Sequence, residues 1–480
     1  VAGVETLLGG AGSDLILFDR RVDGALVDLG AGADRLTLSA IGNRVSVAGI
    51  EEILGSNGAD DVTMLDAAAD ALVALGVGRD RLALSDAADS LRLRGVEALE
   101  AGGGDDTITL LDTVRGAHLH LGEGADRLLL ADGDNILTAA CAETILGAGG
   151  ADVVTLGAAM PSGWVDLGGG ADRLVLTRGG NRIAVAGTEL VQGSDGADTI
   201  DLAGGADGVV LRLGAGLDHV LLGPGGNRVT LADVEQVTGG TGADIVTMAR
   251  AVAGAEIDLG EGVDRLLLGP GANAVTLRGV EAVVGGLGAD AVTIAGASGT
   301  VAVALGGGSD VLTLGDGGIA VVTTDVELVR GGAGDDVIAL TAASRRTRMV
   351  GGEGSDTLAG GGGDDELQGG PGADRLAGGP GADLFVYTAI SQSPVWAPDT
   401  IINFNPLEGD VLAFAGIGTG EDFRWRGAFA FSAHGGAEGR FDEATKTLFI
   451  DLNGNGTADM AFLLPGFPPA GFDGNSVIWA

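Results

Sequence analysis

The sequence repeats itself every 46 residues over most of its length, and this period restricts the possible folds more than any other feature. One glutamate marks the start of each unit. Each unit also contains two glycine-rich turns that end in aspartate. The glutamates are Glu5, Glu51, Glu97, Glu143, Glu189, Glu235, Glu281 and Glu327. The first aspartate series is Asp14, Asp60, Asp106, Asp152, Asp198, Asp244, Asp290 and Asp336, and the second is Asp34, Asp80, Asp126, Asp172, Asp218, Asp264, Asp310 and Asp356.

Each of these aspartates is followed by a short alternating segment. The residues two and four places later are apolar, as in Ile108 and Leu110 after Asp106. This period of two predicts a short strand with one buried face. One coil cannot bury such a face alone, so stacked coils of a solenoid are expected. The spacing leaves two geometries open. Either both aspartate series occupy one corner of coils that alternate between 20 and 26 residues, which we favour, or they lie on opposite sides of a 46-residue coil.

A tighter repeat of nine residues follows the long units and ends at Asp356, Asp365, Asp374 and Asp383. It resembles the RTX nonapeptide, Gly-Gly-x-Gly-x-Asp-x-apolar-x. The resemblance implies a right-handed parallel β-roll in which calcium lies between the turns of adjacent coils. It places Asp356 and Asp374 on one edge and Asp365 and Asp383 on the other. The implied calcium-binding glycines are Gly351, Gly352, Gly354, Gly360, Gly361, Gly363, Gly369, Gly370, Gly372, Gly378, Gly379 and Gly381, and Asp336 joins the aspartates as a ligand.

Electrostatics also favours calcium at these turns. Stacked coils are about 4.8 Å apart, and carboxylates at that spacing repel one another by about 1 kcal/mol per pair even in water. Calcium takes six to eight oxygen ligands. Arginines directly follow several second-series aspartates and are expected to compete with the ion there, as Arg127 does after Asp126. The alternative is that each aspartate only caps its own turn. The long-repeat aspartates named above, from Asp14 to Asp310, and Asp399 are therefore a second group of candidate ligands.

The composition changes after Asp383. Of 17 aromatic residues, only Phe18 and Trp164 precede it, so an aromatic β-rich cap is expected. This order resembles the C-terminal domain of serralysin-type proteases, without their catalytic half. The resemblance implies an uncleaved signal for a type I secretion transporter at residues 472–480. We expect three domains: the degenerate repeats (1–347), the regular β-roll (348–387), and the cap with its signal (388–480).

The charge and composition exclude several classes of protein. The net charge is −40 and Lys446 is the only lysine, which argues against nucleic-acid binding. A single cysteine, Cys141, excludes a disulfide framework. No run of 18 apolar residues predicts a transmembrane segment. A sugar-processing β-helix enzyme would need aromatic and basic groups in a cleft, which residues 1–383 scarcely provide. We therefore expect no enzyme activity.

Two functions remain. The first is an extracellular calcium-binding structural protein: an adhesin, a surface-layer protein or a matrix component that contacts the cell surface, polysaccharide or its own copies. The second is a secretion and folding module for a domain that precedes Val1. Smaller expectations accompany these functions. The glutamates pair with arginines, the recurrent asparagines bond the backbone of turns, and residues 451–459 form a hairpin rather than an EF-hand. The histidines lack metal-ligand spacing, and Cys141 is buried.

Overall fold

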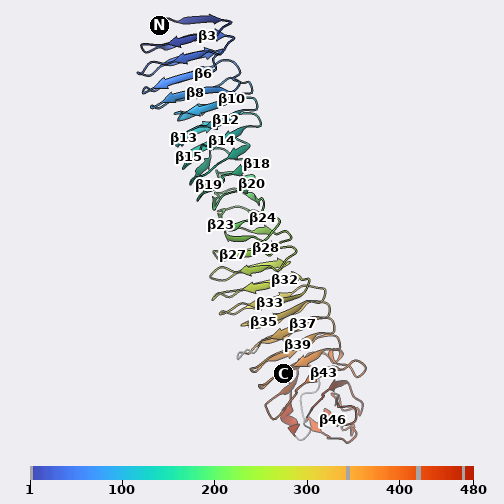
Figure 1. The fold of residues 1–480 in the computed structure, drawn as a ribbon. Helices are drawn as coiled ribbons and strands as arrows, with labels where there is room; N and C mark the ends of the chain where they lie inside the picture. The colour runs from blue at the N-terminus through green and yellow to red at the C-terminus, as the bar shows by residue number, and fades with distance from the viewer. Residues whose placement is uncertain (1–3, 342–345, 418–422, 468–470, 480) are drawn as a thin grey trace. The chain divides into compact units, whose positions relative to one another are not determined.

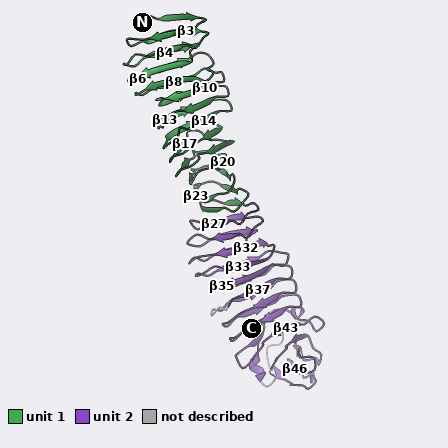
Figure 2. Cartoon of the chain, in the orientation of Figure 1, with its two compact units in different colours: residues 1–238 green, residues 239–480 purple. Residues whose placement is uncertain are grey.

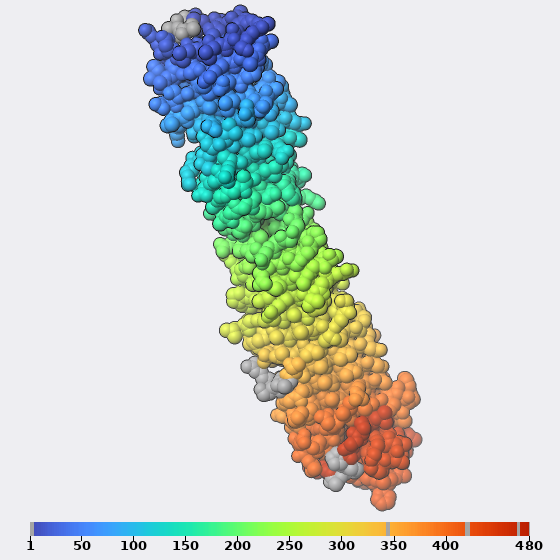
Figure 3. Space-filling model, in the orientation of Figure 1, coloured from blue at the N-terminus to red at the C-terminus, as the bar shows by residue number. Residues whose placement is uncertain are grey.

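The computed structural model describes residues 4–341, 346–417, 423–467 and 471–479. It divides into two compact units, residues 1–238 and 239–480, which Figure 2 colours separately. Within each unit, short strands follow one another coil upon coil (Figure 1). Figure 3 shows the colours changing in successive bands along each unit, so consecutive coils lie side by side.

In residues 1–238 the strands alternate between two parallel sheets. The odd-numbered strands are β1 (Thr6–Gly10), β3 (Asp23–Gly30), β5 (Arg44–Ala48), β7 (Asp61–Met64), β9 (Arg81–Ala83), β11 (Ala98–Glu100), β13 (Arg115–His120), β15 (Ile136–Ala140), β17 (Val153–Leu156), β19 (Arg173–Val175), β21 (Leu190–Gln192), β23 (Asp207–Arg212) and β25 (Arg228–Ala232). The even-numbered strands are β2 (Leu15–Leu17), β4 (Arg35–Thr37), β6 (Glu52–Ser56), β8 (Ala71–Gly76), β10 (Ser90–Arg94), β12 (Thr107–Leu110), β14 (Arg127–Leu129), β16 (Thr144–Leu146), β18 (Gly163–Asp166), β20 (Arg182–Ala186), β22 (Thr199–Leu202), β24 (His219–Leu222) and β26 (Gln236–Thr238).

In residues 239–480 the strands alternate between two parallel sheets as far as β44, and after β44 this alternation ends. The odd-numbered strands of the solenoid are β27 (Ile245–Met248), β29 (Arg265–Leu267), β31 (Ala282–Val284), β33 (Thr300–Ala304), β35 (Ala320–Thr324), β37 (Val337–Leu340), β39 (Thr357–Ala359), β41 (Arg375–Ala377) and β43 (Asp399–Ile402). The even-numbered strands are β28 (Ala253–Asp258), β30 (Ala274–Arg278), β32 (Ala291–Gly296), β34 (Val311–Leu314), β36 (Leu328–Arg330), β38 (Arg348–Val350), β40 (Glu366–Gln368), β42 (Leu384–Tyr387) and β44 (Val411–Phe414). The C-terminal elements are the 3-10 turns η1 (Ile390–Gln392) and η3 (Gly474–Ser476) and the strands β45 (Arg424–Trp425), β46 (Glu438–Asp442), β47 (Thr447–Asp451), β48 (Met460–Leu463) and β49 (Val477–Trp479).

The strand register confirms an all-β parallel solenoid and corrects the predicted coil lengths. Thr6 pairs with Leu26 one coil later, a step of 20 residues, whereas Arg35 pairs with Glu52, a step of 17. Coils of 20 and 26 residues are therefore wrong. One 46-residue unit contains five strands, since Thr6 in β1 corresponds to Glu52 in β6. Five strands make two and a half turns rather than two coils, so successive units start in opposite sheets.

Apolar columns between the two sheets form the core of each unit. Strands such as β8 alternate buried and half-buried residues, as the period of two predicts. Leu36 stacks on Ile53 in the next coil, and both are at most 1 % exposed. The leucine that replaces the first glycine of the second-series turns also belongs to this core. Leu29 and Leu75 are fully buried, so this departure from the nonapeptide contributes apolar packing.

The aromatic residues after Asp383 close the C-terminal end of the second unit. Phe385 pairs in register with Leu412 of β44, which in turn pairs with Val477 of β49. Tyr387 packs against Phe462 with ring centroids 4.8 Å apart. Strands β46, β47 and β48 are antiparallel neighbours, unlike the solenoid strands. Residues 451–459 join β47 to β48, so the predicted hairpin is confirmed.

Candidate calcium-binding edges

The aspartate turns lie along two edges, which we define by the strands that they join. Edge 1 contains the connections from odd- to even-numbered strands, and edge 2 contains those from even- to odd-numbered strands. Asp14 and Asp34 lie on edge 1, whereas Asp60 and Asp80 of the next unit lie on edge 2. The two aspartates of one unit thus share an edge, but successive units use opposite edges, so the expectation that both whole series occupy one corner is wrong. The 26 residues between Asp34 and Asp60 cross to the other edge because they make one and a half turns.

Each edge is a ladder of hydrogen bonds between consecutive coils. The backbone N–H of Asp60 donates to Oδ1 of Asp80 at 2.7 Å. The nonapeptides continue this pattern: Asp356 donates to Asp374 at 2.8 Å on edge 2, and Asp365 donates to Asp383 at 2.9 Å on edge 1. Each turn aspartate therefore uses one carboxylate oxygen to hold the neighbouring coil.

Asparagine and glutamate extend the same ladder in the long units. Asn43 donates its backbone N–H to Asp60 Oδ1 at 2.7 Å, and its side chain donates to the backbone oxygen of Ser39. The prediction that these asparagines bond the backbone is confirmed. Glu97 Oε2 accepts the backbone N–H of Asp80 at 2.9 Å. Pairing of the glutamate series with arginine was therefore the wrong expectation at this position. The same acceptor role recurs at Glu51, Glu143, Glu189, Glu235, Glu281 and Glu327.

The second carboxylate oxygen of these aspartates is buried without a hydrogen-bond partner among the described residues. The aspartates concerned are at most 2 % exposed. A buried polar atom without a partner costs about 1–3 kcal/mol, and a charged one costs more. This second oxygen is Oδ2, and the aspartates in which it has no partner are Asp34, Asp60, Asp80, Asp106, Asp126, Asp152, Asp172, Asp198, Asp218, Asp264, Asp290, Asp310, Asp356, Asp365, Asp374 and Asp383.

Backbone oxygens converge near these free carboxylate oxygens. A Cβ added to Gly360 would lie 2.5 Å from the carbonyl oxygen of Gly378 and 2.6 Å from Oδ2 of Asp365. Only glycine leaves this space open to oxygen atoms of two coils. Gly55 faces the corresponding atoms of Leu75 and Asp60 in a long unit. Calcium is the hard cation that takes such a mixed set of carboxylate and carbonyl oxygens, so the residues present fit it on both kinds of repeat.

Burial raises the pKa of the turn carboxylates. Desolvation is the largest cause throughout, and neighbouring carboxylates add to it. The pKa of Asp80 and Asp356 rises to about 6, that of Asp374 and Asp383 to about 7, and that of Asp399 to about 8. Without a cation the edges therefore favour the protonated acids. A bound divalent cation would reverse this preference by stabilising the charged form.

The arginines after second-series aspartates lie on the sheet faces rather than over the turns. Arg35 Nε is 3.4 Å from a carboxylate oxygen of Glu52, and Arg81 is 3.4 Å from one of Asp61. The expected competition of these two arginines with calcium is therefore wrong. Side chains in a strand alternate between its faces, and these residues start the strand after the turn.

Both ladders end at aspartates of the C-terminal region. Asp399 accepts the backbone N–H of Asp374 at 2.9 Å and the hydroxyl of Tyr387 at 3.0 Å. Asp410 accepts the backbone N–H of Asp383 at 2.9 Å on edge 1. Sequence reasoning missed Asp410 as a ladder residue, although Gly409-Asp410 repeats the glycine–aspartate pattern.

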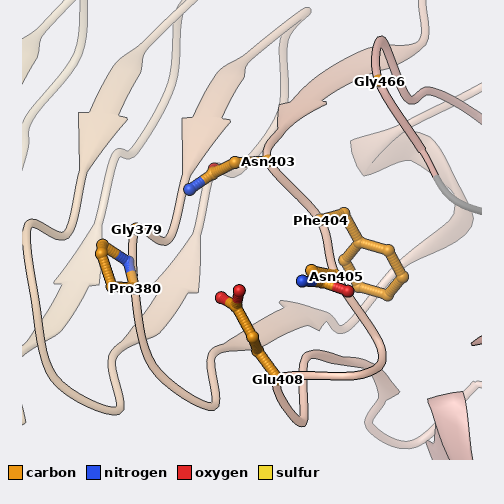
Figure 4. A pocket seen from close by; sticks show the side chains of 7 residues that line it. All are labelled: Gly379, Pro380, Asn403, Phe404, Asn405, Glu408 and Gly466. Atoms are coloured by element: carbon orange, nitrogen blue, oxygen red, sulfur yellow. The ribbon is translucent and has the colours of Figure 1, made fainter.

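A cavity of about 370 Å³ lies beside the last nonapeptide turn. Figure 4 shows Glu408 and Asn403 extending into the space in front of Gly379 and Pro380. Its lining adds the carboxylate of Glu408 and the amides of Asn403 and Asn405 to the oxygen-rich end of edge 1. Within the described ranges, no three acidic, histidine or cysteine side chains form a metal-binding group by themselves. Backbone carbonyls must therefore supply much of any calcium coordination.

These observations define a class: a parallel β-solenoid with acidic, glycine-rich turns that fit calcium. The model of the RTX calcium-binding nonapeptide repeat, four copies long, matches residues 183–218, 323–340 and 350–385. The chain therefore contains RTX calcium-binding nonapeptide repeats in these three segments. The first match lies inside the long units and includes Asp198 and Asp218, so the family pattern extends beyond the regular nonapeptides. Comparison with curated proteins gives no match.

Two further expectations concern the membrane and the secretion signal. Among the residues that the structure describes, no helix is long and apolar enough to cross a membrane. The proposed signal at residues 472–480 contains η3 and β49, and Ala480 lies outside the described residues.

Proposed function

We propose that this chain is an extracellular structural protein whose calcium-loaded solenoid acts as an adhesin, a surface-layer protein or a matrix component. The observation that carries the proposal is the pair of edge ladders with buried, unpartnered Oδ2 atoms. Their charge is tolerable at neutral pH only when a cation neutralises it. Extracellular calcium is abundant, so the ladders would be filled outside the cell.

Calcium binding would couple folding to secretion by a type I transporter. The ligand set is assembled from successive coils, so it exists only in the folded chain, and binding free energy becomes folding free energy. With a net charge of −40, the calcium-free chain repels itself. Such a chain would stay unfolded where calcium is scarce, pass the transporter extended, and fold outside.

A structural role is favoured over catalysis by where the acidic groups lie. The carboxylates that dominate the edges are engaged in holding neighbouring coils, as Asp80 and Asp374 are. They form a regular ladder rather than a local cluster around a cleft. We therefore infer that calcium here stabilises the fold and takes part in no reaction.

The C-terminal region also favours a second candidate function, a secretion and folding module. Asp399 and Asp410 accept the last hydrogen bonds of the two edge ladders. This region is therefore suited to cover the end of the solenoid and to be the place where its folding begins. In that case the activity would belong to a domain joined before Val1, and the described repeats would serve its export.

Export from bacteria that carry a type I transporter tests the proposal. The intact chain should accumulate in the medium and become protease-resistant only with millimolar calcium. Retention in the cell, or protease resistance in chelator, would contradict it. The exported, calcium-loaded chain should also bind polysaccharide or cells, or assemble with its own copies. A chain that does none of these, but exports an enzyme fused before Val1, would favour the second function.

A further inference from the structure

We propose that His118, His120 and Cys141 form a binding site for zinc or a chemically similar transition metal on the outer face of the first unit. This site is separate from the calcium ladders. It is formed by nitrogen and sulfur atoms, which suit zinc, whereas calcium prefers oxygen.

The strand geometry places two imidazoles on one face. His118 and His120 are two residues apart in β13, with buried Leu119 between them, and both are exposed. Alternation along a strand directs both side chains away from the core. Sequence reasoning found no ligand spacing here, but a His-x-His pair has the required spacing when its segment is a strand.

The cysteine approaches the same pair from the next coil. Cys141 Sγ lies 3.9 Å from Nε2 of His120. A tetrahedral zinc with bonds of about 2.3 Å to sulfur and 2.0 Å to nitrogen would separate these atoms by about 3.5 Å. The observed separation is therefore close to that of two ligands of one ion. Cys141 is half-buried rather than buried, so the expectation for it was wrong.

The neighbours of the pair leave room for an ion. His118 lies between Ala98 and Thr138 in register, and His120 lies between Glu100 and Ala140. The alanines are small, and Glu100 adds negative charge beside His120. The three candidate ligands do not yet form a metal-binding group in their present orientations. The exposure of His118 allows its side chain to rotate toward the other two.

The repeat itself provides an internal comparison for this site. The positions 46 residues before and after Cys141 are Gly95 and Gly187, and both have positive φ, as Cys141 does at 54°. A residue with a side chain adopts this conformation less readily than glycine does. The corresponding positions for His120 are Ala74 and Asp166. Asp233 and Asp325 show that this position also accepts a side chain in other units. The feature specific to this unit is therefore the combination of a thiol with two histidines.

Cobalt(II) spectroscopy on the full-length, calcium-saturated and freshly reduced chain tests this site. Cobalt should give a thiolate-to-metal charge-transfer band, which zinc should remove by competition. Oxygen ligands cannot produce that band, so the calcium edges do not interfere. A wild-type chain without the band would overturn the proposal.

Two variants and a control make the test specific. Cys141→Gly restores the residue of the neighbouring units, so it should fold well, yet lose the band. It should also lower zinc affinity by at least about tenfold, as even residues that only orient a ligand do. His120→Ala should weaken binding similarly, whereas His219→Ala on β24 should leave it unchanged. Unaltered cobalt spectra and zinc affinity in Cys141→Gly and His120→Ala would assign the metal to another site.

Discussion

Each turn aspartate has two different carboxylate oxygens. In Asp374, Oδ1 accepts the backbone N–H of Asp356, whereas Oδ2 is buried without a partner among the described atoms. The first oxygen fixes the distance between coils, and the second is available to a cation. This division explains why the carboxylate stabilises the folded chain when calcium is bound and destabilises it when calcium is absent.

The first prediction concerns pH in the absence of calcium. The pKa of Asp374 rises from 3.8 to about 7 and that of Asp399 to about 8 on folding, because burial disfavours the charged form. A raised carboxylate pKa means that the folded chain binds more protons. Its stabilising effect is complete below the unfolded pKa and is lost as pH rises through the folded value. In chelator, β-structure measured by circular dichroism should therefore increase from about pH 8 to about pH 5.

Calcium should reverse this pH dependence. Protons compete with the ion for the same carboxylates, so the calcium concentration at the folding midpoint should increase as pH falls over the same range. The same direction of pH dependence with and without calcium would contradict the assignment of these carboxylates as ligands.

The second prediction compares Asp374→Asn with Asp126→Asn. Asparagine retains an acceptor for the ladder but removes the charge. In chelator, Asp374→Asn should stabilise the fold, since no buried charge remains. In calcium titrations it should raise the folding midpoint, because a charged ligand is lost. The increase should exceed that of Asp126→Asn, because the glycines of the nonapeptide turns let more backbone carbonyl oxygens converge on the ion. Circular dichroism measures both effects. A larger shift for Asp126→Asn would show that the long units contain the stronger sites.

At the scale of the element, the five strands of a unit have different turn residues. The turns before β2, β4, β5 and β6 end at Asp14, Asp34, Asn43 and Glu51, and Val22 precedes β3. The glycine–aspartate pattern identifies only two of these turns. Sequence reasoning therefore found the solenoid and the edge shared within a unit, but it did not identify the half turn that moves the next unit to the other edge. The nonapeptides have one aspartate for every strand, which is why their edges could be assigned from sequence.

The third prediction tests the buried asparagines that hydrogen-bond neighbouring coils along the edges. Asn135 is fully buried, and its side chain accepts the backbone N–H of Val114 and donates to Ala131 and Asp152. Replacing it with alanine leaves these buried groups unsatisfied and should cost about 1–3 kcal/mol. Chemical denaturation in saturating calcium would measure this loss. Asn475→Ala, at an exposed position, should change stability by less than about 0.5 kcal/mol. Equal effects would show that Asn135 has no special role.

The roles of glutamate and arginine could not be read from the sequence. Glu97 bonds a backbone N–H 17 residues earlier in the chain, and Arg81 bonds Asp61 in the neighbouring strand. Both depend on a 17- or 20-residue register that is set only when the coils stack. The aromatic cap, in contrast, was evident from composition, although its ladder residue Asp410 was not identified.

At the scale of the whole molecule, the fourth prediction concerns the C-terminal cap. Asp399 and Asp410 satisfy the last nonapeptide N–H groups, and Phe385 packs in register against Leu412. Removing residues 388–480 would expose that core and leave strand edges open. The truncated chain should fail to fold even in calcium, as judged by circular dichroism. Folding with the calcium midpoint of the intact chain would show that the cap contributes only to secretion.

The central claim is that calcium binding is what makes this acidic solenoid fold. Far-UV circular dichroism of the intact chain near neutral pH, recorded in chelator and then during calcium addition, tests it most directly. The account predicts a coil spectrum in chelator and a cooperative change to β-structure at millimolar calcium. Elemental analysis of the folded product should find several calcium ions per chain. A β spectrum that is the same in chelator and in calcium would contradict the account.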